Sequence, residues 1–166
     1  AAFDQLVAAC RDMGLQVMLD GVFNHVSRNH PAVQAALDET AGRLNPADNP
    51  WHGLVRAHVG DNGEPALDVF EGHGDLVALD HSADETVDYV VHVMSHWLDR
   101  GAAGWRLDAA YAVPSPFWAR VLPQVKAAHP YSWIFGEVIH GDYPRIIEES
   151  TMDSITQYEL WKSIQH

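Results

Sequence analysis

The sequence has a single cysteine, few basic residues and no long apolar run, and each shortage excludes a class of protein. Cys10 cannot form an internal disulfide, and its helical spacing among apolar neighbours predicts a buried, unreactive thiol in a cytoplasmic protein. No stretch approaches the roughly 20 apolar residues that a membrane-spanning helix needs. Ten basic against 23 acidic residues give a formal net charge of −13, which argues against nucleic acid as a partner.

A unit of one helix followed by one buried strand opens the sequence. Apolar residues at helical spacing predict a helix over 3–13, and Gly14 supplies the left-handed residue that ends it. The nearly continuous apolar run over 15–19 predicts a strand that is buried on both faces. This strand leads to Asp20, so it delivers a carboxylate at its C-terminal end.

The same unit recurs over 82–108, 115–137 and, more weakly, 146–156. The strand of the first of these ends at Asp108, and the strand of the second ends at Glu137. Strands that alternate with helices imply right-handed crossovers and a parallel sheet. Carboxylates at the C-terminal ends of successive strands are typical of a (β/α)8 TIM barrel, whose chemistry lies at that face. The sequence therefore predicts an α/β fold that is a fragment of such a barrel.

The stretch over 26–79 breaks this rhythm. It contains four prolines and six glycines, with little periodicity beyond a short helix predicted at 32–37. We interpret it as a long excursion after the first visible strand, inserted within a partial catalytic barrel formed by residues 1–166. Loops of this length in compact domains are usually functional.

Asp108 and Glu137 form a candidate catalytic pair. Cleaving a glycosidic bond with retention needs two carboxylates about 5–5.5 Å apart, one to attack the anomeric carbon and one to protonate the leaving oxygen. Neighbouring strands lie about 4.8 Å apart, so the ends of consecutive parallel strands fit this spacing. Arg106 lies two residues before Asp108 and shares its face of the strand, where a guanidinium can orient the carboxylate.

Several segments resemble conserved segments of the α-amylase family, glycoside hydrolase family 13. Residues 20–25 (DGVFNH) resemble the first of these segments, residues 104–110 (GWRLDAA) the one that carries the nucleophile, and residues 136–138 (GEV) the one that carries the acid/base. Residues 75–80 resemble the short segment before the third helix of the family, so the resemblance spans essentially the whole chain. The motif Gly-Trp-Arg-Leu-Asp, with Phe117-Trp118 after it, is more similar to the neopullulanase and cyclomaltodextrinase branch than to secreted α-amylases.

The resemblance implies a retaining α-glucoside hydrolase that acts on α-glucans or maltooligosaccharides by double displacement through a covalent glycosyl-enzyme. It implies Asp108 as the nucleophile, Glu137 as the acid/base and Arg106 as the partner of the nucleophile. Asp20 is expected to support Arg106, and His25 is expected to bind the sugar in the cleavage subsite.

The resemblance also implies a place in the family fold and a metal content. The visible strands correspond to the third to sixth barrel strands, and residues 26–79 correspond to the excursion called domain B. Asn24 matches a position that ligates calcium in many α-amylases, whereas Ala112 stands where those members usually supply a histidine carbonyl. We therefore expect no required cofactor, with calcium at Asn24 as an option.

Two alternative functions remain open. A glucan- or sucrose-type transglycosylase of the same family shares this chemistry and differs in whether water or a sugar hydroxyl intercepts the intermediate. A noncatalytic sugar-binding barrel is the other alternative, but the intact Asp108, Arg106 and Glu137 count against it. The third catalytic Asp of the family, in an Asn-His-Asp segment on the seventh strand, has no counterpart in this sequence. We therefore expect residues 1–166 alone to be inactive.

Overall fold

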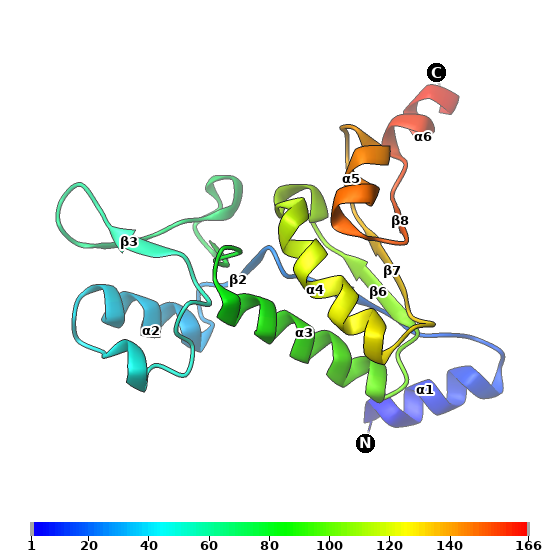
Figure 1. The fold of residues 1–166 in the computed structure, drawn as a ribbon, viewed down its shortest axis with the longest axis horizontal. Coiled ribbons are helices and arrows are strands. Elements are labelled where there is room, and N and C mark those ends of the chain that lie inside the picture. Colours follow the sequence, from blue (N-terminus) through cyan, green and yellow to red (C-terminus); the bar gives the residue numbers. More distant parts are fainter. Residues whose placement is uncertain (1, 166) are drawn as a thin grey trace. The chain divides into compact units, whose positions relative to one another are not determined.

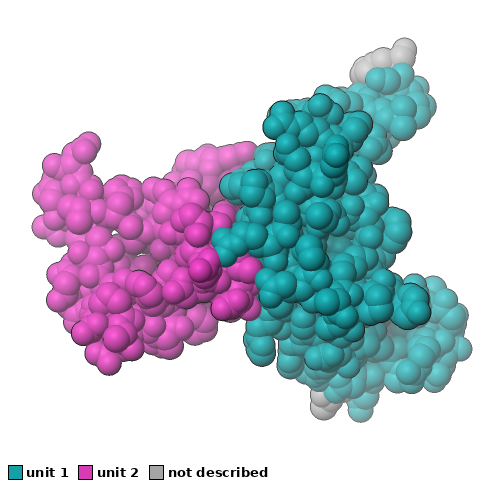
Figure 2. All heavy atoms as spheres, viewed as in Figure 1, with its two compact units in different colours: residues 1–22, 90–166 teal, residues 23–89 magenta. Residues whose placement is uncertain are grey.

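The computed structural model describes residues 2–165, which fall into two compact units (Figure 1, Figure 2). The first unit takes in the chain up to Val22 and again from Val90 onward, and the second unit is Phe23–Tyr89. None of the helices in this described part of the chain is long and apolar enough to cross a membrane.

A four-stranded parallel sheet with the strand order β1-β6-β7-β8 forms the centre of the first unit. The strands are β1 (Met18–Gly21), β6 (Gly104–Leu107), β7 (Trp133–Gly136) and β8 (Ser154–Ile155). The unit also contains α1 (Ala2–Asp12), the C-terminal part of α3 (Asp84–Asp99), a 3-10 turn η3 (Ala110–Ala112), α4 (Ser115–Ala128), α5 (Tyr143–Ser150) and α6 (Tyr158–Gln165). The predicted α/β fold with a parallel sheet is therefore confirmed.

Glycine ends two of these helices through the same backbone motif. After α1, the Leu15 N–H donates to Cys10 O at 2.8 Å, and Gly14 has a φ of 74°. Gly101 ends α3 with a φ of 97°, and the Ala102 N–H donates to Trp97 O at 3.1 Å. This is the Schellman motif, in which a residue without a Cβ adopts the left-handed conformation at little steric cost. The predicted role of Gly14 as a helix stop is confirmed.

One face of the sheet carries the core of the first unit. In Figure 1, α4 lies over β6 and β7, with α3 next to it in the view. The buried apolar side chains of these elements are Val90, Met94, Leu98, Trp105, Leu107, Phe117, Trp118, Val121, Leu122, Val125 and Ile134. Fully burying one such side chain contributes roughly 1.5–3 kcal/mol, so this cluster holds the helices to the strands.

The opposite face of the sheet is partly open. Trp133 on β7 is 52% exposed and Met18 on β1 is 41% exposed, and both belong to one cross-strand row with Gly104. Leu15, which precedes β1, is 56% exposed. The prediction of a strand over 15–19 that is buried on both faces is therefore wrong. The strand begins at Met18, and its Met18 side chain lies on the face of the sheet opposite the buried core, where it stays in solvent.

Short antiparallel strands and a helix surround a separate core in the second unit. β2 (His25–Ser27) pairs with β5 (Leu76–Ala78), and β3 (Ala57–Val59) pairs with β4 (Pro65–Leu67). The unit also contains α2 (Pro31–Thr40), two 3-10 turns, η1 (Pro46–Asp48) and η2 (Phe70–Gly72), and the start of α3. Its core consists of Ala32, Val33, Ala36, Leu54, Val55, Val77 and Leu79. The helix predicted at 32–37 is confirmed and is longer than predicted.

Candidate active site

Asp20, Arg106 and Phe135 occupy one cross-strand row of the sheet in the first unit. The parallel register aligns Asp20 on β1 with Arg106 on β6, and Arg106 with Phe135 on β7. Asp108 and Glu137 each follow two residues later along the chain, so side-chain alternation places them on the same face as the row. The predicted carboxylates therefore meet at the C-terminal edge of the sheet, where parallel α/β folds keep their chemistry.

Hydrogen bonds of the sheet continue past the ends of β6 and β7 and fix the backbone of both candidate catalytic residues. The Asp108 N–H donates to Gly21 O at 3.0 Å, and the Glu137 N–H donates to Leu107 O at 2.8 Å. Because these backbone groups are bonded to neighbouring strands, the two carboxylates project from rigid positions.

The Arg106 guanidinium contacts three carboxylates at once. Its Nη1 lies 2.7 and 3.0 Å from the two oxygens of Asp20 and 2.8 Å from Asp108 Oδ1, and its Nη2 lies 2.9 Å from Glu137 Oε1. The hydrogen bond to Asp20 first, and then the one to Asp108, raise the pKa of Arg106 above its ordinary value, against the opposing effect of burial. Arg106 is therefore a permanent cation that ties the three carboxylates together. The contact with Glu137 was not predicted from the sequence.

Solvent reaches these carboxylates unequally. The Asp108 and Glu137 side chains are 27% and 18% exposed, whereas the Asp20 side chain is 58% exposed. Water therefore screens the ion pairs of Asp108 and Glu137 less than that of Asp20. Asp108 and Glu137 are therefore the better candidates for carboxylates that take part in a reaction. The more exposed Asp20 is the better candidate for a residue that supports Arg106.

Two further groups contact the Glu137 carboxylate. The Ala109 N–H donates to Oε2 at 3.1 Å, and the Tyr158 hydroxyl donates to Oε1 at 3.2 Å. Ala109 has φ 46° and ψ 36°, a left-handed conformation that costs a non-glycine residue roughly 1–2 kcal/mol. Backbone strain of this kind persists where surrounding contacts hold it, often at functional sites.

Neither Ala109 nor Tyr158 was predicted from the sequence as a contact of Glu137. The backbone conformation of Ala109 leaves no trace in its residue type. Tyr158 begins α6, a helix that was not predicted, although Leu160, Trp161 and Ile164 show helical spacing. That spacing could have located the helix, but it gives no sign of which carboxylate the tyrosine meets.

Gly136 allows two segments to approach closely beside Glu137. A Cβ at this position would lie 2.6 Å from Met152 Sδ and 2.9 Å from Ala110 Cβ, closer than such atoms pack. Ala110 directly follows Ala109, so the missing side chain at Gly136 lets the turn after β6 reach the carboxylate. The Gly-Glu sequence at this strand end therefore has a steric reason.

His25 and Asn24 lie in the second unit. The His25 ring stacks on Phe70, with ring centroids 5.0 Å apart and an interplanar angle of 19°. Asn24 is buried, and its Nδ2 lies 3.2 Å from His25 Nδ1. These contacts fix the orientation of the imidazole, as a ligand-contacting side chain requires.

Calcium at Asn24 stays a prediction. Calcium takes six to eight oxygen ligands, and the contact that the structure describes for the Asn24 side chain is that of its Nδ2 with His25 Nδ1. Within residues 2–165, no group of three or more His, Cys, Asp or Glu side chains is placed to hold a metal. His92 and His96 on α3 are four residues apart, as in two-histidine zinc sites, but they belong to no such group, and their ring centroids are 6.4 Å apart.

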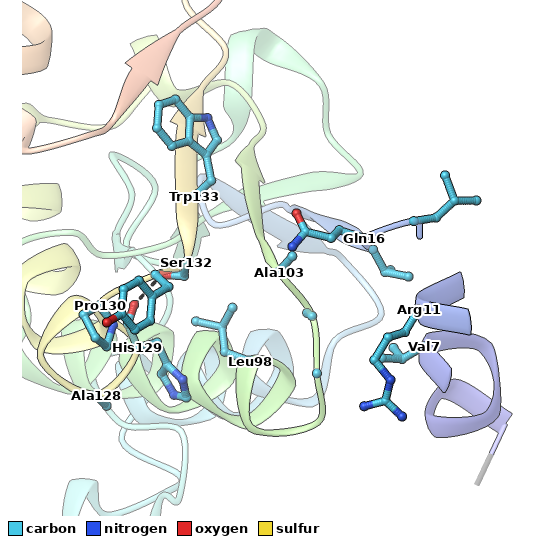
Figure 3. A pocket seen from close by; sticks show the side chains of 15 residues that line it. Val7, Arg11, Gln16, Leu98, Ala103, Ala128, His129, Pro130, Ser132 and Trp133 are labelled. Carbon is cyan, nitrogen blue, oxygen red and sulfur yellow. Dashed lines mark hydrogen bonds between the residues drawn. The ribbon is translucent and has the colours of Figure 1, made fainter. Parts of the chain in front are cut away.

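A cavity of about 500 Å³ lies at the other end of the strands (Figure 3). Gln16, Ala103 and Ser132 line it, and each of them precedes a strand, so the cavity lies at the amino ends of parallel strands. Figure 3 shows Arg11 and His129 on opposite sides of the hollow. None of the lining residues is an Asp or Glu, so this cavity cannot supply the carboxylate pair. The candidate active site is therefore at the carboxyl ends of the strands.

Comparisons with known proteins point to one family. The family model described as "Alpha amylase, catalytic domain" matches residues 1–165. A cyclomaltodextrinase from a Bacillus species is 28% identical over 161 residues, which cover 96% of this chain and 28% of that protein. An intracellular maltogenic amylase from Bacillus subtilis (strain 168) is 28% identical over 143 residues, which cover 86% of this chain and 23% of that protein.

A solved structure supports the same relationship. The crystal structure of Ttha1563 from Thermus thermophilus aligns with a TM-score of 0.81 and 27% identity, over 98% of this chain and 34% of that one. The chain thus spans between 23% and 34% of the length of these three proteins. Because the family model covers nearly all of it, this chain belongs to the α-amylase catalytic-domain family, in the branch of the neopullulanases and cyclomaltodextrinases.

Proposed function

We propose that the complete protein containing this chain is a retaining α-glucoside hydrolase that acts on α-glucans or maltooligosaccharides. The observation that carries the proposal is the Arg106 guanidinium, which contacts Asp108 and Glu137 at the ends of neighbouring parallel strands in a chain of the α-amylase family. Two carboxylates on one face, both in contact with the same permanent cation, suit double displacement.

The proposed reaction has two steps. In the first, Asp108 attacks the anomeric carbon while Glu137 gives its proton to the glycosidic oxygen that leaves, and a covalent glycosyl-enzyme forms. In the second, the ionised Glu137 takes a proton from water, whose oxygen attacks the anomeric carbon and releases Asp108. Arg106 orients Asp108 in both steps, and Asp20 orients Arg106.

We assign β1, β6, β7 and β8 to the third to sixth strands of a (β/α)8 barrel. In support, these strands are parallel, follow chain order across the sheet and are separated by helices. The second unit is inserted between β1 and the middle of α3, and we assign 26–79 within it to domain B. In this assignment His25 contacts the sugar in the cleavage subsite, and residues 1–166 are part of the barrel and inactive alone.

No cofactor enters the proposal, and the partner of the site is the sugar substrate rather than nucleic acid or a membrane. The net charge of −13 supports the exclusion of nucleic acid. The single Cys10 and the intracellular relative support a cytoplasmic location. We expect the activity to survive dialysis against EDTA. A loss of activity that added calcium restores would instead support a calcium ion at Asn24.

Covalent trapping tests the proposal directly. A slow, activated fluoro-sugar incubated with the complete protein should leave a glycosyl group on the peptide that contains Asp108, as detected by mass spectrometry. Proton NMR of the first product released from an α-linked substrate should show the α-anomer. A label on Glu137, or a β-anomer as first product, would overturn the assignment. Products longer than the substrate would indicate the transglycosylase instead.

A further inference from the structure

We propose that Tyr158 is a positioning residue for Glu137, and that its hydroxyl holds the acid/base carboxylate in the orientation that proton transfer requires. The inference rests on the proposed function, because it assigns Tyr158 a part in the same site. It adds a group from outside the four segments that resemble the family, and it is carried by contacts around one carboxylate.

The donors to Glu137 come from both sides of its strand. Arg106 and Ala109 belong to β6 and the turn after it, and they contact the carboxylate at 2.9 and 3.1 Å. Tyr158 follows β8, which is the neighbour of β7 on the other side, and its hydroxyl contacts Oε1 at 3.2 Å. Without Tyr158, the described contacts would hold the carboxylate from the β6 side alone.

The start of α6 is fixed to the end of β7 by hydrogen bonds next to Glu137. The Thr156 N–H donates to Gly136 O at 3.0 Å. The Thr156 hydroxyl donates to Val138 O at 2.9 Å and accepts from the Val138 N–H at 2.9 Å. These bonds attach Thr156 to the residues on either side of Glu137, and Tyr158 is two residues further on. The chain therefore presents the tyrosine to this carboxylate from a short, anchored segment.

The charges around the site keep the Tyr158 hydroxyl a donor. Its hydrogen bond to the Glu137 carboxylate, and then the negative charge of that group, raise the pKa of Tyr158, while Arg106 acts in the opposite direction. Asp20 and Asp108 are the other carboxylates that contact Arg106. A phenol that stays protonated stabilises the ionised form of Glu137, which is the form that must activate water in the second step.

Tyr158→Phe in the complete protein tests the kinetic part of the proposal. We expect kcat/KM on a maltooligosaccharide to fall by about tenfold, since the acid/base loses part of a contribution of about 10²–10⁴. On an aryl maltoside with a good leaving group, kcat/KM should change by less than about threefold, because departure of that group needs little protonation. The alkaline limb of the pH profile should move to higher pH. A merely structural role would lower kcat/KM equally on both substrates and leave the pH profile unchanged.

Tyr143→Phe is the matched control. Its hydroxyl donates to the Ile139 carbonyl at 3.1 Å rather than to Glu137. Tyr143→Phe removes the same chemical group as Tyr158→Phe, and it should leave the ratio of activities on the two substrates unchanged. An equal ratio for Tyr158→Phe and Tyr143→Phe would overturn the proposal.

A titration makes the inference testable apart from activity. With ¹³C-labelled tyrosine, the ring signal of Tyr158 should titrate at a higher pH in the wild-type protein than in Glu137→Gln. An unchanged titration would show that the contact with the carboxylate is absent and would overturn the inference, whatever the kinetics. If the titration shifts but the wild-type protein cleaves no α-glucoside, the contact stands and the proposed function fails.

Discussion

Asp20 and Arg106 face each other on adjacent strands although they are 86 residues apart in the sequence, and Arg106 Nη1 lies within 3.0 Å of both Asp20 oxygens. An arginine held in this way presents its remaining N–H groups in fixed directions, so it can orient Asp108 without first ordering a flexible side chain. The insertion of the whole second unit between these two residues leaves the contact intact.

Asp108→Asn should abolish turnover in the complete protein and leave its fold nearly unchanged. The amide keeps the size of the side chain and can still accept from Arg106 Nη1, but it lacks the anionic oxygen that attacks the anomeric carbon. Steady-state kinetics on a maltooligosaccharide and a thermal melt measure the two effects. Asp38→Asn, which changes a half-buried carboxylate paired with Arg43 in the second unit, is the control and should keep its activity. Near-normal turnover of the Asp108 variant would remove it as the nucleophile.

Glu137→Gln should separate substrates by their leaving groups. We expect activity on natural glucosides to fall by about 10²–10⁴-fold, because the leaving oxygen can no longer be protonated, while substrates with good leaving groups lose much less. Added azide should restore turnover of the latter by attacking the glycosyl-enzyme, and the product from an α-substrate should be the α-azide, because two successive inversions retain the configuration. Equal losses on both kinds of substrate, without rescue, would argue against Glu137 as the acid/base.

The sequence predicts the carboxylates better than their surroundings. Asp20, Asp108 and Glu137 could be placed because short apolar runs mark buried strands, and a polar residue at the end of a run marks the strand end. The register that sets Arg106 opposite Asp20 comes from the structure, and the support of Arg106 by Asp20 was expected from the family resemblance alone.

Contacts that depend on packing between distant segments could not be predicted. Tyr158 reaches Glu137 from a helix whose docking is set by tertiary hydrogen bonds. The exposure of Trp133, 52%, could not be predicted either, because an apolar strand does not reveal which of its faces is covered. The same ambiguity explains the wrong prediction for 15–19.

Gly136→Ala should destabilise the protein and disturb the site together. The new Cβ would lie 2.9 Å from Ala110 Cβ and 2.6 Å from Met152 Sδ, and overpacking of this kind costs about 1–3 kcal/mol. Thermal melts of the complete protein should show a lower Tm, with a fall in kcat because the Ala109 N–H moves away from Glu137. Gly74→Ala is the control, since a Cβ there meets nothing within 4 Å. A Tm equal to that of the Gly74 variant would contradict the steric account.

His81 should make the second unit less stable in mild acid. Burial chiefly lowers its pKa below the ordinary value of 6.5, and its hydrogen bond to the Phe23 carbonyl acts in the opposite direction. A group whose folded pKa is depressed contributes stability above its unfolded pKa and loses it as the pH falls through the folded pKa. Melts should therefore show a Tm that decreases as the pH falls below about 6.5.

His81→Gln should flatten that pH dependence, because its amide can donate to the Phe23 carbonyl without titrating. His92→Gln, at an exposed position on α3, is the control and should leave the pH dependence as in the wild-type protein. A His81 variant that loses stability in acid as steeply as the wild-type protein would show that other groups cause the effect.

Residues 1–166 expressed by themselves should expose surfaces that favour association. In the described sheet β1 pairs with β6 and β8 pairs with β7, so the outer edges of β1 and β8 present backbone N–H and C=O groups without a strand partner. Large apolar side chains of the first unit are also exposed: Leu6, Met13, Leu15, Met18, Tyr131, Trp133, Leu160, Trp161 and Ile164. Open edges and exposed apolar side chains together promote aggregation.

We therefore predict that the isolated chain is aggregated or molten and inactive on maltooligosaccharides. The sequence supplies Asp108 and Glu137 but no Asn-His-Asp segment, so even a folded chain would lack a carboxylate that contributes to transition-state stabilisation in the family. Size-exclusion chromatography, calorimetry and a reducing-sugar assay, with the complete protein as the control, measure these properties. A sharp unfolding transition with a monomeric elution profile, or measurable hydrolysis by the isolated chain, would show that these four strands are sufficient for the fold or for the chemistry.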